Sequence, residues 1–420
     1  MAELLAVGVF ILAIALIATE RLHRTVVALT GGAFVILIGL IEQEPAIEAV
    51  DWAVLGLLAG MMILVWGAQQ TGIFTWLAVA VGRASGGRPA MLVLGLTGAT
   101  ALLSAFLDNV TTVLLVVPVT LVLADTLDID AAPLVVAEVI ASNIGGAATL
   151  IGDPPNIIIG SAANLGFVDF LIHVGPPAVL GYAAAMSWLY LRHGRQFVPE
   201  KERLEALASL DPTAGLGPRR DVVIVLACTG LTILGFFVHG VFHLEPATVA
   251  MSGAALFLLV GRPDIETALE GIEWTTLFFF GGLFVMVGAL EVNGTLERVA
   301  EALRDVTGGN RTAEVLGIAW TAAIASGLVD NIPFTAAMVP VVRDLSAEGS
   351  DVSWWALSLG ACYGGNLTLI GASANLVAAG ALNRANRPLS FVSFMKYGIP
   401  ATMISMAIGS LWLLLLLAVE

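Results

Sequence analysis

The chain has 420 residues, of which 58% are hydrophobic and 12% are charged, and its mean hydropathy is +0.94. A soluble domain carries about 25% charged residues, so this composition excludes a soluble protein and predicts a surface that mostly faces lipid. The net charge of −15 comes from loops rather than from a nucleic-acid-binding surface, so we expect no nucleic-acid partner. Neither of the two lysines follows a glycine-rich phosphate loop, which argues against ATP-driven transport.

Apolar stretches of about 20 residues predict ordinary membrane spans. The first is interpreted as a retained span, because no cationic region precedes it and no small-residue cleavage site follows it. In chain order the predicted spans are 3–19, 25–41, 52–72, 171–191, 221–239, 245–260, 272–290 and 397–418.

Four further apolar stretches are too long or too broken for one ordinary helix. They are 91–123, broken at Asp108-Asn109; 132–163, broken at Gly145-Gly146 and at 152–156; 313–345, broken at Asp330-Asn331; and 354–383, broken at Gly364-Gly365-Asn366 and at 371–375. Such breaks predict that the backbone leaves the helical conformation inside the membrane at these positions.

The polar stretch 192–220 predicts a linker between two halves, with a short amphipathic helix at 200–210 on the membrane surface. Its arginines place it in the cytoplasm by the positive-inside rule. Both termini then lie outside, each half crosses the membrane an odd number of times, and the halves are inverted. We therefore predict an all-α polytopic fold with about ten transmembrane helices and two re-entrant hairpins.

An internal repeat supports this plan. Residues 104–110 (Ser-Ala-Phe-Leu-Asp-Asn-Val) match 326–332, with an offset of 222, and prolines follow at Pro118 and Pro340. Residues 145–156 match 364–375 with an offset of 219, and seven of the twelve positions are identical. The predicted first repeat is 1–191, with scaffold spans in 1–90 and transport elements in 91–191. The second is 221–420, with scaffold spans in 221–312 and transport elements in 313–420.

Irregular backbone at membrane depth persists only where protein or water satisfies its polar groups, and secondary transporters build ion sites from such breaks. We therefore expect the two hairpin tips and the two broken loops to converge on one cavity. The candidate binding residues are Asp108, Asn109, Thr111, Thr112, Asn143, Gly145, Gly146, Thr149, Asp153 and Asn156 in the first repeat, and Asp330, Asn331, Thr335, Gly364, Gly365, Asn366, Thr368 and Asn375 in the second.

The carboxylates have two explanations. Asp153 precedes Pro154, which favours a capping role at a helix N-terminus. Asp108 and Asp330 recur at membrane depth, where a carboxylate is costly, which favours a role in binding a cation or a proton. The sequence offers a possible Na⁺ position at Asp108, Asn109, Asp330 and Asn331. Glu138 is either a second proton carrier or a residue near the membrane interface.

These motifs resemble the ion transporter superfamily that contains the ArsB arsenite permeases, the NhaD Na⁺/H⁺ antiporters, the citrate-transporter-like proteins and, more distantly, the divalent anion/Na⁺ symporters. The stretches 108–118, 143–156 and 329–340 look most like the P-protein-like permeases. The resemblance implies a scaffold domain and a moving transport domain. Of the symporters' Ser-Asn-Thr signature only the Asn is present at each tip, and Ala372-Ser373-Ala374 replaces Asp-Pro-Pro in the second loop.

From this resemblance we expect a multi-pass cell-membrane protein that is not an enzyme and works as a secondary active transporter. It would couple an inorganic anion or an arsenite-like metalloid to H⁺ or Na⁺ by an elevator-like motion. A Na⁺/H⁺ antiporter and an anion channel are the alternatives. Because no Arg or Lys stands at any motif, and the nearest is Arg343, the antiporter gains support. We expect no cofactor beyond a bound Na⁺ or H⁺, contacts with lipid, and a homodimer.

Overall fold

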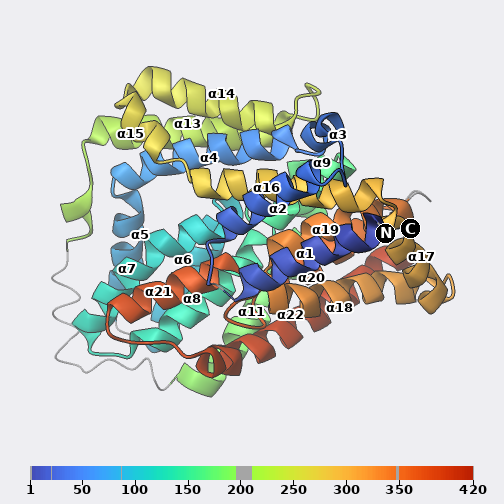
Figure 1. The fold of residues 1–420 in the computed structure, drawn as a ribbon. Coiled ribbons are helices and arrows are strands. Elements are labelled where there is room, and N and C mark those ends of the chain that lie inside the picture. The colour runs from blue at the N-terminus through green and yellow to red at the C-terminus, as the bar shows by residue number, and fades with distance from the viewer. Residues whose placement is uncertain (1, 20, 87, 195–210, 347–349, 420) are drawn as a thin grey trace.

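A computed structural model describes residues 2–19, 21–86, 88–194, 211–346 and 350–419. In these ranges the protein is built from helices and turns, without a strand, as predicted (Figure 1). The amphipathic helix expected at 200–210 lies outside the described residues. The two halves of the chain give two series of helices that correspond, except that one long C-terminal helix stands where the first half has two helices.

The first half begins with helices that correspond to the predicted opening spans and ends at the linker. Its helices are α1 Ala2–Ala18, α2 Arg24–Leu37, α3 Gln43–Glu48, α4 Trp52–Gln70, α5 Ile73–Ala84, α6 Pro89–Phe106, α7 Asn109–Leu127, α8 Ala131–Gly146, α9 Pro154–Ala163, α10 Phe167–His173 and α11 Gly175–His193.

The second half follows a short 3-10 turn, η2 Pro212–Gly215. Its helices are α13 Arg219–Val238, α14 Pro246–Gly261, α15 Ile265–Glu270, α16 Trp274–Val292, α17 Thr295–Thr307, α18 Arg311–Val329, α19 Asn331–Leu345, α20 Val352–Gly364, α21 Ser373–Arg384 and α22 Phe391–Val419. The four broken stretches become the pairs α6–α7, α8–α9, α18–α19 and α20–α21, as the sequence predicts.

Among the described residues, seven helices are long and apolar enough to cross a membrane, or eight if the bent pair α9–α10 is one span. Five shorter apolar helices bring this set to twelve, compared with the expected ten or so spans and two hairpins. The predicted span 25–41 is too long, because the chain turns at Gly39 with φ +73° and α2 ends at Leu37. Hydropathy missed α5 and α17, since α5 is short and α17 carries five charged residues.

Local signals explain where helices begin. The carboxylates of Asp51 and Asp264 accept the backbone N–H groups of Val54 and Thr267, and so satisfy donors that have no partner in the first turn. The turns before α5 and α17 both need a left-handed residue, and glycine stands at each, Gly72 and Gly294, with φ of 70° and 72°. The same turn chemistry therefore recurs 222 residues apart.

Helices of the first half pack against helices of the second half in two equivalent pairs. Helix α2 packs along α16, and its counterpart α14 packs along α4; within the halves, α6 packs on α8 and α18 on α20. Small residues allow the close approach: a Cβ on Gly60 would lie 2.7 Å from the carbonyl carbon of Ala250, and one on Gly282 would lie 2.5 Å from that of Ala28. These two contacts are related by the repeat, so the halves are arranged about an approximate two-fold axis.

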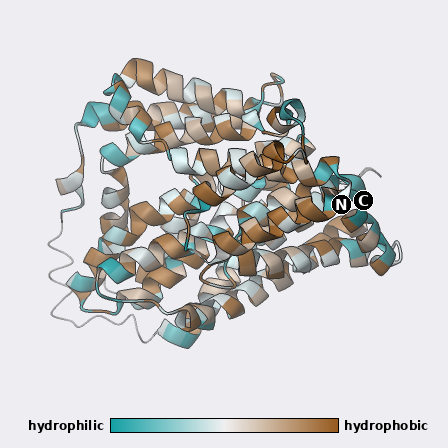
Figure 2. Cartoon of the chain, in the orientation of Figure 1, coloured by the Kyte–Doolittle hydropathy of each residue, from teal (hydrophilic) through white to brown (hydrophobic). Residues whose placement is uncertain are grey.

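The halves are inverted. Both termini lie on one side of the molecule, at the right in Figure 1, whereas α11 ends and α13 begins on the opposite side. Figure 2 shows hydrophobic residues along the helices, with hydrophilic residues gathered at helix ends and connections. Many large apolar side chains point outward, for example Leu4 at 76% and Leu191 at 84% exposed. This is the surface expected of a protein that faces lipid. The division into scaffold and transport spans stays a prediction.

Candidate functional site

The two hairpin tips are built by aspartates that cap the helices following them. The Oδ1 atom of Asp108 accepts the backbone N–H of Thr111 at 2.8 Å, and its Oδ2 accepts the Thr111 hydroxyl. The Oδ1 atom of Asp330 accepts the N–H of Ile332 at 3.0 Å. The tips differ in strain, because Asp330 has φ +123°, a conformation that is costly for a residue with a Cβ.

The two broken loops are held by equivalent asparagines. The Nδ2 atom of Asn156 donates to the carbonyls of Ala147 and Thr149 at 3.0 and 2.9 Å. The Nδ2 atom of Asn375 does the same for Gly365 and Thr368, at 2.7 and 2.9 Å. Each amide therefore satisfies two carbonyls that have left the helix, which a membrane interior could not do.

The loop threonines tie each loop to its own hairpin. The hydroxyl of Thr149 donates to the carbonyl of Ala105, and that of Thr368 donates to the carbonyl of Gly327. Both acceptors lie just before a hairpin tip, at positions related by the repeat. Hairpin and loop are therefore one hydrogen-bonded unit in each half.

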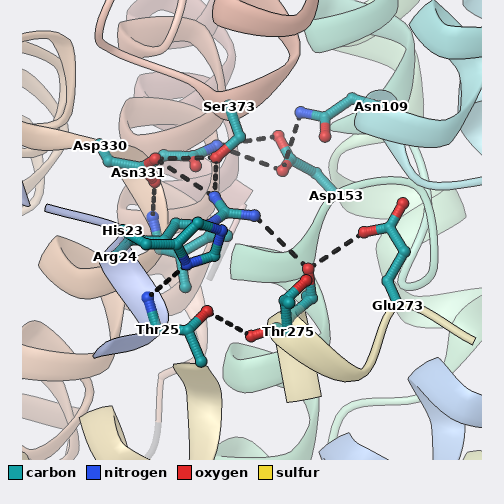
Figure 3. A network of polar contacts seen from close by, with 12 residues as sticks. His23, Arg24, Thr25, Asn109, Asp153, Glu273, Thr275, Asp330, Asn331 and Ser373 are labelled. Atoms are coloured by element: carbon teal, nitrogen blue, oxygen red, sulfur yellow. Dashed lines mark hydrogen bonds and ion pairs between the residues drawn. The ribbon is translucent and has the colours of Figure 1, made fainter. Parts of the chain in front are cut away.

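Asp153 lies where the two units meet. Its carboxylate accepts the Nδ2 of Asn109 at 3.2 Å and the Nδ2 of Asn331 at 3.2 and 3.3 Å, so equivalent residues of both repeats hold it (Figure 3). The side chain is completely buried. Asp153 occupies the N-cap position of α9, but its side chain makes no capping hydrogen bond. The expected capping role is wrong, because the two amides take the carboxylate oxygens instead.

Asn143 links the centre to the second repeat. Its Nδ2 donates to the Oδ1 atoms of Asn366 and Asn375 at 2.9 and 3.0 Å, and its own Oδ1 accepts the Nδ2 of Asn109 at 3.1 Å. The repeat places Cys362 at the position equivalent to Asn143, and its Sγ lies 3.5 Å from the Oδ1 of Asn156. Asn143 of the first half therefore contacts asparagines of the second half, and Cys362 of the second half contacts Asn156 of the first.

The site also contains a positively charged side chain, Arg24, from a segment that is distant in the sequence. The Nη1 atom of Arg24, at the start of α2, donates to the Ser373 hydroxyl and lies 4.0 Å from the Oδ2 of Asp330, which also accepts that hydroxyl at 3.0 Å. Its Nη2 lies 3.4 Å from the Oγ1 of Thr276, and its guanidinium lies 5.2 Å from the centre of the Phe279 ring.

No Arg or Lys lies within the motifs along the sequence, as expected. The expectation that the site itself lacks such a residue is wrong, because the fold brings Arg24 to it. Arg24 is about 300 residues from Asp330 in the chain, and packing of α2 against α16 brings it there. Its only signal in the sequence was an arginine at the start of a predicted span, which the positive-inside rule explained without reference to the site.

The other predicted residues have defined places. Thr335 bonds back to the Asn331 carbonyl at 2.7 Å, and the hydroxyl of Thr112 has no partner within the described ranges. Cβ atoms on Gly145 and Gly364 would lie 2.3 and 2.4 Å from carbonyl oxygens of α6 and α18. Gly146 and Gly365 approach the backbone of the loop residues Gly152 and Gly371. These glycines allow helices to touch and offer no ligand atoms from side chains.

The four residues of the possible Na⁺ position divide into two pairs. Asn109 and Asn331 direct their amide nitrogens at Asp153, whereas Asp108 and Asp330 bind the N-termini of their own helices. The described part of the chain contains no group of three or more His, Cys, Asp or Glu side chains with the geometry of a metal site. Among the described residues, the centre combines the buried carboxylates of Asp153 and Asp330 with the guanidinium of Arg24.

A cavity of about 280 Å³ opens beside Arg24, Asp330 and Ser373, and is otherwise lined mostly by apolar side chains. A larger one, about 600 Å³, lies between α4, α9 and the α13–α14 connection, and includes none of the candidate residues. The two occupy equivalent places, because Leu22 and His23 line the first where Leu244 and Glu245 line the second. The cavity at Arg24 reaches the site at Asp330 and Ser373.

Comparison with known proteins agrees with this architecture. The chain is 42% identical to an uncharacterized transporter of Mycobacterium tuberculosis over 420 residues, covering 98% of both chains. It is 40% identical to the 46 kDa membrane protein of Mycobacterium leprae, again with 98% of both chains covered. It is 35% identical to the human P protein, with 95% of this chain and 58% of that protein covered.

Among solved structures, the crystal structure of the YdaH transporter of Alcanivorax borkumensis has a similar fold, with a TM-score of 0.58 over 98% of this chain and 97% of that chain, at 15% identity. The family described as citrate transporter matches residues 14–360. Together with the membrane-spanning helices, these matches make the protein a multi-pass protein of the cell membrane. The chain belongs to the citrate transporter family.

Proposed function

We propose that the protein is a secondary active transporter that moves a small anion and couples this movement to H⁺ or Na⁺. The observation that carries the proposal is the guanidinium of Arg24, which lines a cavity beside Asp330 and Ser373. Without this arginine, the site would contain only carboxylates, amides and hydroxyls, and a cation would be the better substrate.

The guanidinium suits a charged oxygen ligand. Arginine keeps its charge at any physiological pH and binds carboxylates and oxyanions through two parallel N–H groups. The side chain of Arg24 is 25% exposed, so it is open to the cavity although it already contacts Ser373. A carboxylate such as citrate, which the family description suggests, or a charged inorganic oxyanion fits this chemistry better than neutral arsenite does.

The carboxylates explain why a cation should accompany the anion. Asp108, Asp153 and Asp330 lie around the centre with one guanidinium among them. An anion entering this region adds negative charge in a place with little water, and the cost falls if H⁺ or Na⁺ enters with it. The charge of Asp153 lies at the middle of this region, since asparagines of both repeats hold it.

The equivalent cavities support alternating access. The cavity at Arg24 opens near the α1–α2 connection, and its counterpart lies near the α13–α14 connection, on the other side of the inverted repeat. An elevator-like movement of the hairpins and broken helices would exchange which of the two cavities opens to the site. The movement belongs to the proposal and rests on the symmetry of the repeats.

Uptake into proteoliposomes tests the proposal. Labelled citrate, phosphate and arsenite are offered separately under imposed pH and Na⁺ gradients, and saturation is measured. We expect gradient-driven, saturable uptake of a charged anion. Arg24→Gln should lower kcat/KM by about tenfold to a hundredfold, the cost of losing a charge-assisted hydrogen bond. Arg21→Gln removes the same charge three residues away on an exposed side chain and should have little effect.

The alternatives give different results in the same vesicles. The excess of carboxylates favours a Na⁺/H⁺ antiporter as the second candidate, and Na⁺-driven proton movement without uptake of any of the three probes would establish it. Uptake that never saturates and ignores both gradients would indicate an anion channel. Equal activity of Arg24→Gln and Arg21→Gln would remove the argument for an anion.

A further inference from the structure

Glu138 is a buried carboxyl group away from the site described above. It lies in the middle of α8 and is 0% exposed. Its Oε1 accepts the Thr120 hydroxyl of α7 at 2.7 Å, whereas its Oε2 has no hydrogen-bond partner in the described part of the chain. The side chain of Glu138 is therefore enclosed within the protein.

Among the residues that the structure describes, no charged group neutralises Glu138. Helix α8 packs against α6, α7, α11, α20, α21 and α22. The titratable or charged side chains on those helices are Asp125, Tyr182, Tyr190, Arg192, His193, Cys362, Tyr363, Arg384, Lys396 and Tyr397. Within the described ranges none of them forms a hydrogen bond or ion pair with Glu138. An ionised carboxylate in such surroundings is very costly, so the neutral, protonated form is favoured.

The repeat shows that the fold does not need this carboxyl group. The position equivalent to Glu138 is Leu357 in α20, and the position equivalent to Thr120 is Val342 in α19. Both are completely buried, so the same helix pair packs with two apolar residues in the second half. The polar pair in the first half is therefore an addition to a packing arrangement that is stable without it.

Glu138 is linked to the site along one face of α8. Ser142 stands one turn further, and its hydroxyl donates to the Ser104 hydroxyl at 3.0 Å and to the Asn109 carbonyl at 3.3 Å. Asn109 in turn holds Asp153. The equivalent of Ser142 in the second half is Ala361, so this polar face also occurs in one repeat only.

We propose that Glu138, supported by Thr120, is the binding site of a proton that moves with the transported anion. The inference rests on the proposed function and deepens it, because it selects H⁺ over Na⁺ as the coupling ion. A carboxyl group with one hydroxyl neighbour can hold a proton, but it lacks the set of oxygen ligands that a metal cation needs. The proton would bind and leave as the Asn109 end of the polar face rearranges.

Infrared difference spectroscopy on the purified full-length protein tests the proton site without any anion. Wild type minus Glu138→Gln should show the C=O band of a protonated carboxyl at neutral pH. The band should shift in D₂O and disappear reversibly at alkaline pH. Thr120→Val should change its frequency. Glu138→Leu introduces the residue found at the equivalent position of the second repeat. This variant should fold like wild type, because the fold does not need the carboxyl group. Glu314→Gln is the matched control, because this second buried glutamate shares a cavity with Arg304 and Arg311.

Absence of a band assignable to Glu138, or a band that neither exchanges in D₂O nor titrates, would overturn the inference. Proteoliposomes then connect the site to transport. Glu138→Gln should keep citrate or phosphate exchange between equal pools, but uptake driven by a pH gradient should fall at least tenfold. Unchanged proton-driven uptake would also overturn it. Failure of wild type to move any probe, with the band present, would refute the proposed function and leave the proton site intact.

Discussion

At the scale of single residues, Asp153 breaks the symmetry of the repeat. The hairpin asparagines, the loop asparagines and the loop threonines all occur in pairs, whereas the position equivalent to Asp153 is Ala372. Asn109 and Asn331 both donate to this one carboxylate. A centre that is shared by two equivalent halves has room for a single group on its axis, and a second carboxylate there would repel the first.

Asp153→Asn should lower transport without unfolding the protein. The amide replaces one acceptor oxygen by a donor, so at least one of the two asparagine N–H groups is left facing another N–H, and a negative charge is lost. We expect gradient-driven anion uptake to fall by about tenfold to a hundredfold. Uptake in proteoliposomes measures it, with Asp221→Asn on the exposed start of α13 as the control. Uptake within twofold of wild type would show that transport does not depend on the charge of Asp153.

At the scale of helices, small residues set how closely the central elements approach. A Cβ on Gly145 of α8 would lie 2.3 Å from the carbonyl oxygen of Ala101, and a Cβ on Gly364 of α20 would lie 2.4 Å from that of Ala323. These are equivalent contacts in the two halves. Both glycines stand at the last turn of their helices, so the contacts position the broken loops that follow them.

Gly145→Ala and Gly364→Ala should therefore destabilise the protein to a similar extent. Backbone atoms must move to accept the methyl group, which costs about 1–3 kcal/mol in a well-packed interior. Thermal unfolding of the detergent-purified variants measures the effect as a lower Tm. Gly317→Ala on α18 is the matched control, since its Cβ would meet nothing within 4 Å. A Tm of wild-type value for both test variants would show that the helices separate easily.

At the scale of the whole molecule, inversion of the halves places equivalent connections on opposite sides. The α1–α2 connection lies toward the linker side, and the α13–α14 connection lies toward the side of the termini (Figure 1). Leu22 and Leu244 are equivalent residues of these connections, 50% and 45% exposed, and each lines one of the two equivalent cavities. They form a matched pair that reports the orientation of the two halves.

Cysteine labelling in cells measures this orientation. The native Cys228 and Cys362 are buried, so added cysteines report their own positions. A membrane-impermeant maleimide should label Leu244→Cys in intact cells, and Leu22→Cys only after the membrane is permeabilised, because the positive-inside rule predicts that the arginine-rich linker side is cytoplasmic. Labelling of both residues from the same side would mean that the halves are parallel and that the alternating cavities do not exist.

The membrane fold, the repeat and most of the residues at the centre could be predicted from the amino-acid sequence. Composition and hydropathy predicted the spans, because lipid leaves few ways to satisfy a backbone. Asn109, Asn331, Asn156 and Asn375 could be identified because Gly, Asn and Asp interrupt apolar helices at the same two places in both halves. Those signals are local, and local signals can be read along a chain.

Which polar side chains contact one another depends on how the helices pack. Asp108 and Asp330 turned out to cap their own helices, and Asp153, expected to cap, turned out to lie between the halves. Arg24 reaches Asp330 through packing of α2 on α16, and Glu138 lies deep beside Thr120. Each of these depends on the rotation and approach of helices that are distant in sequence, which no local pattern of residues encodes.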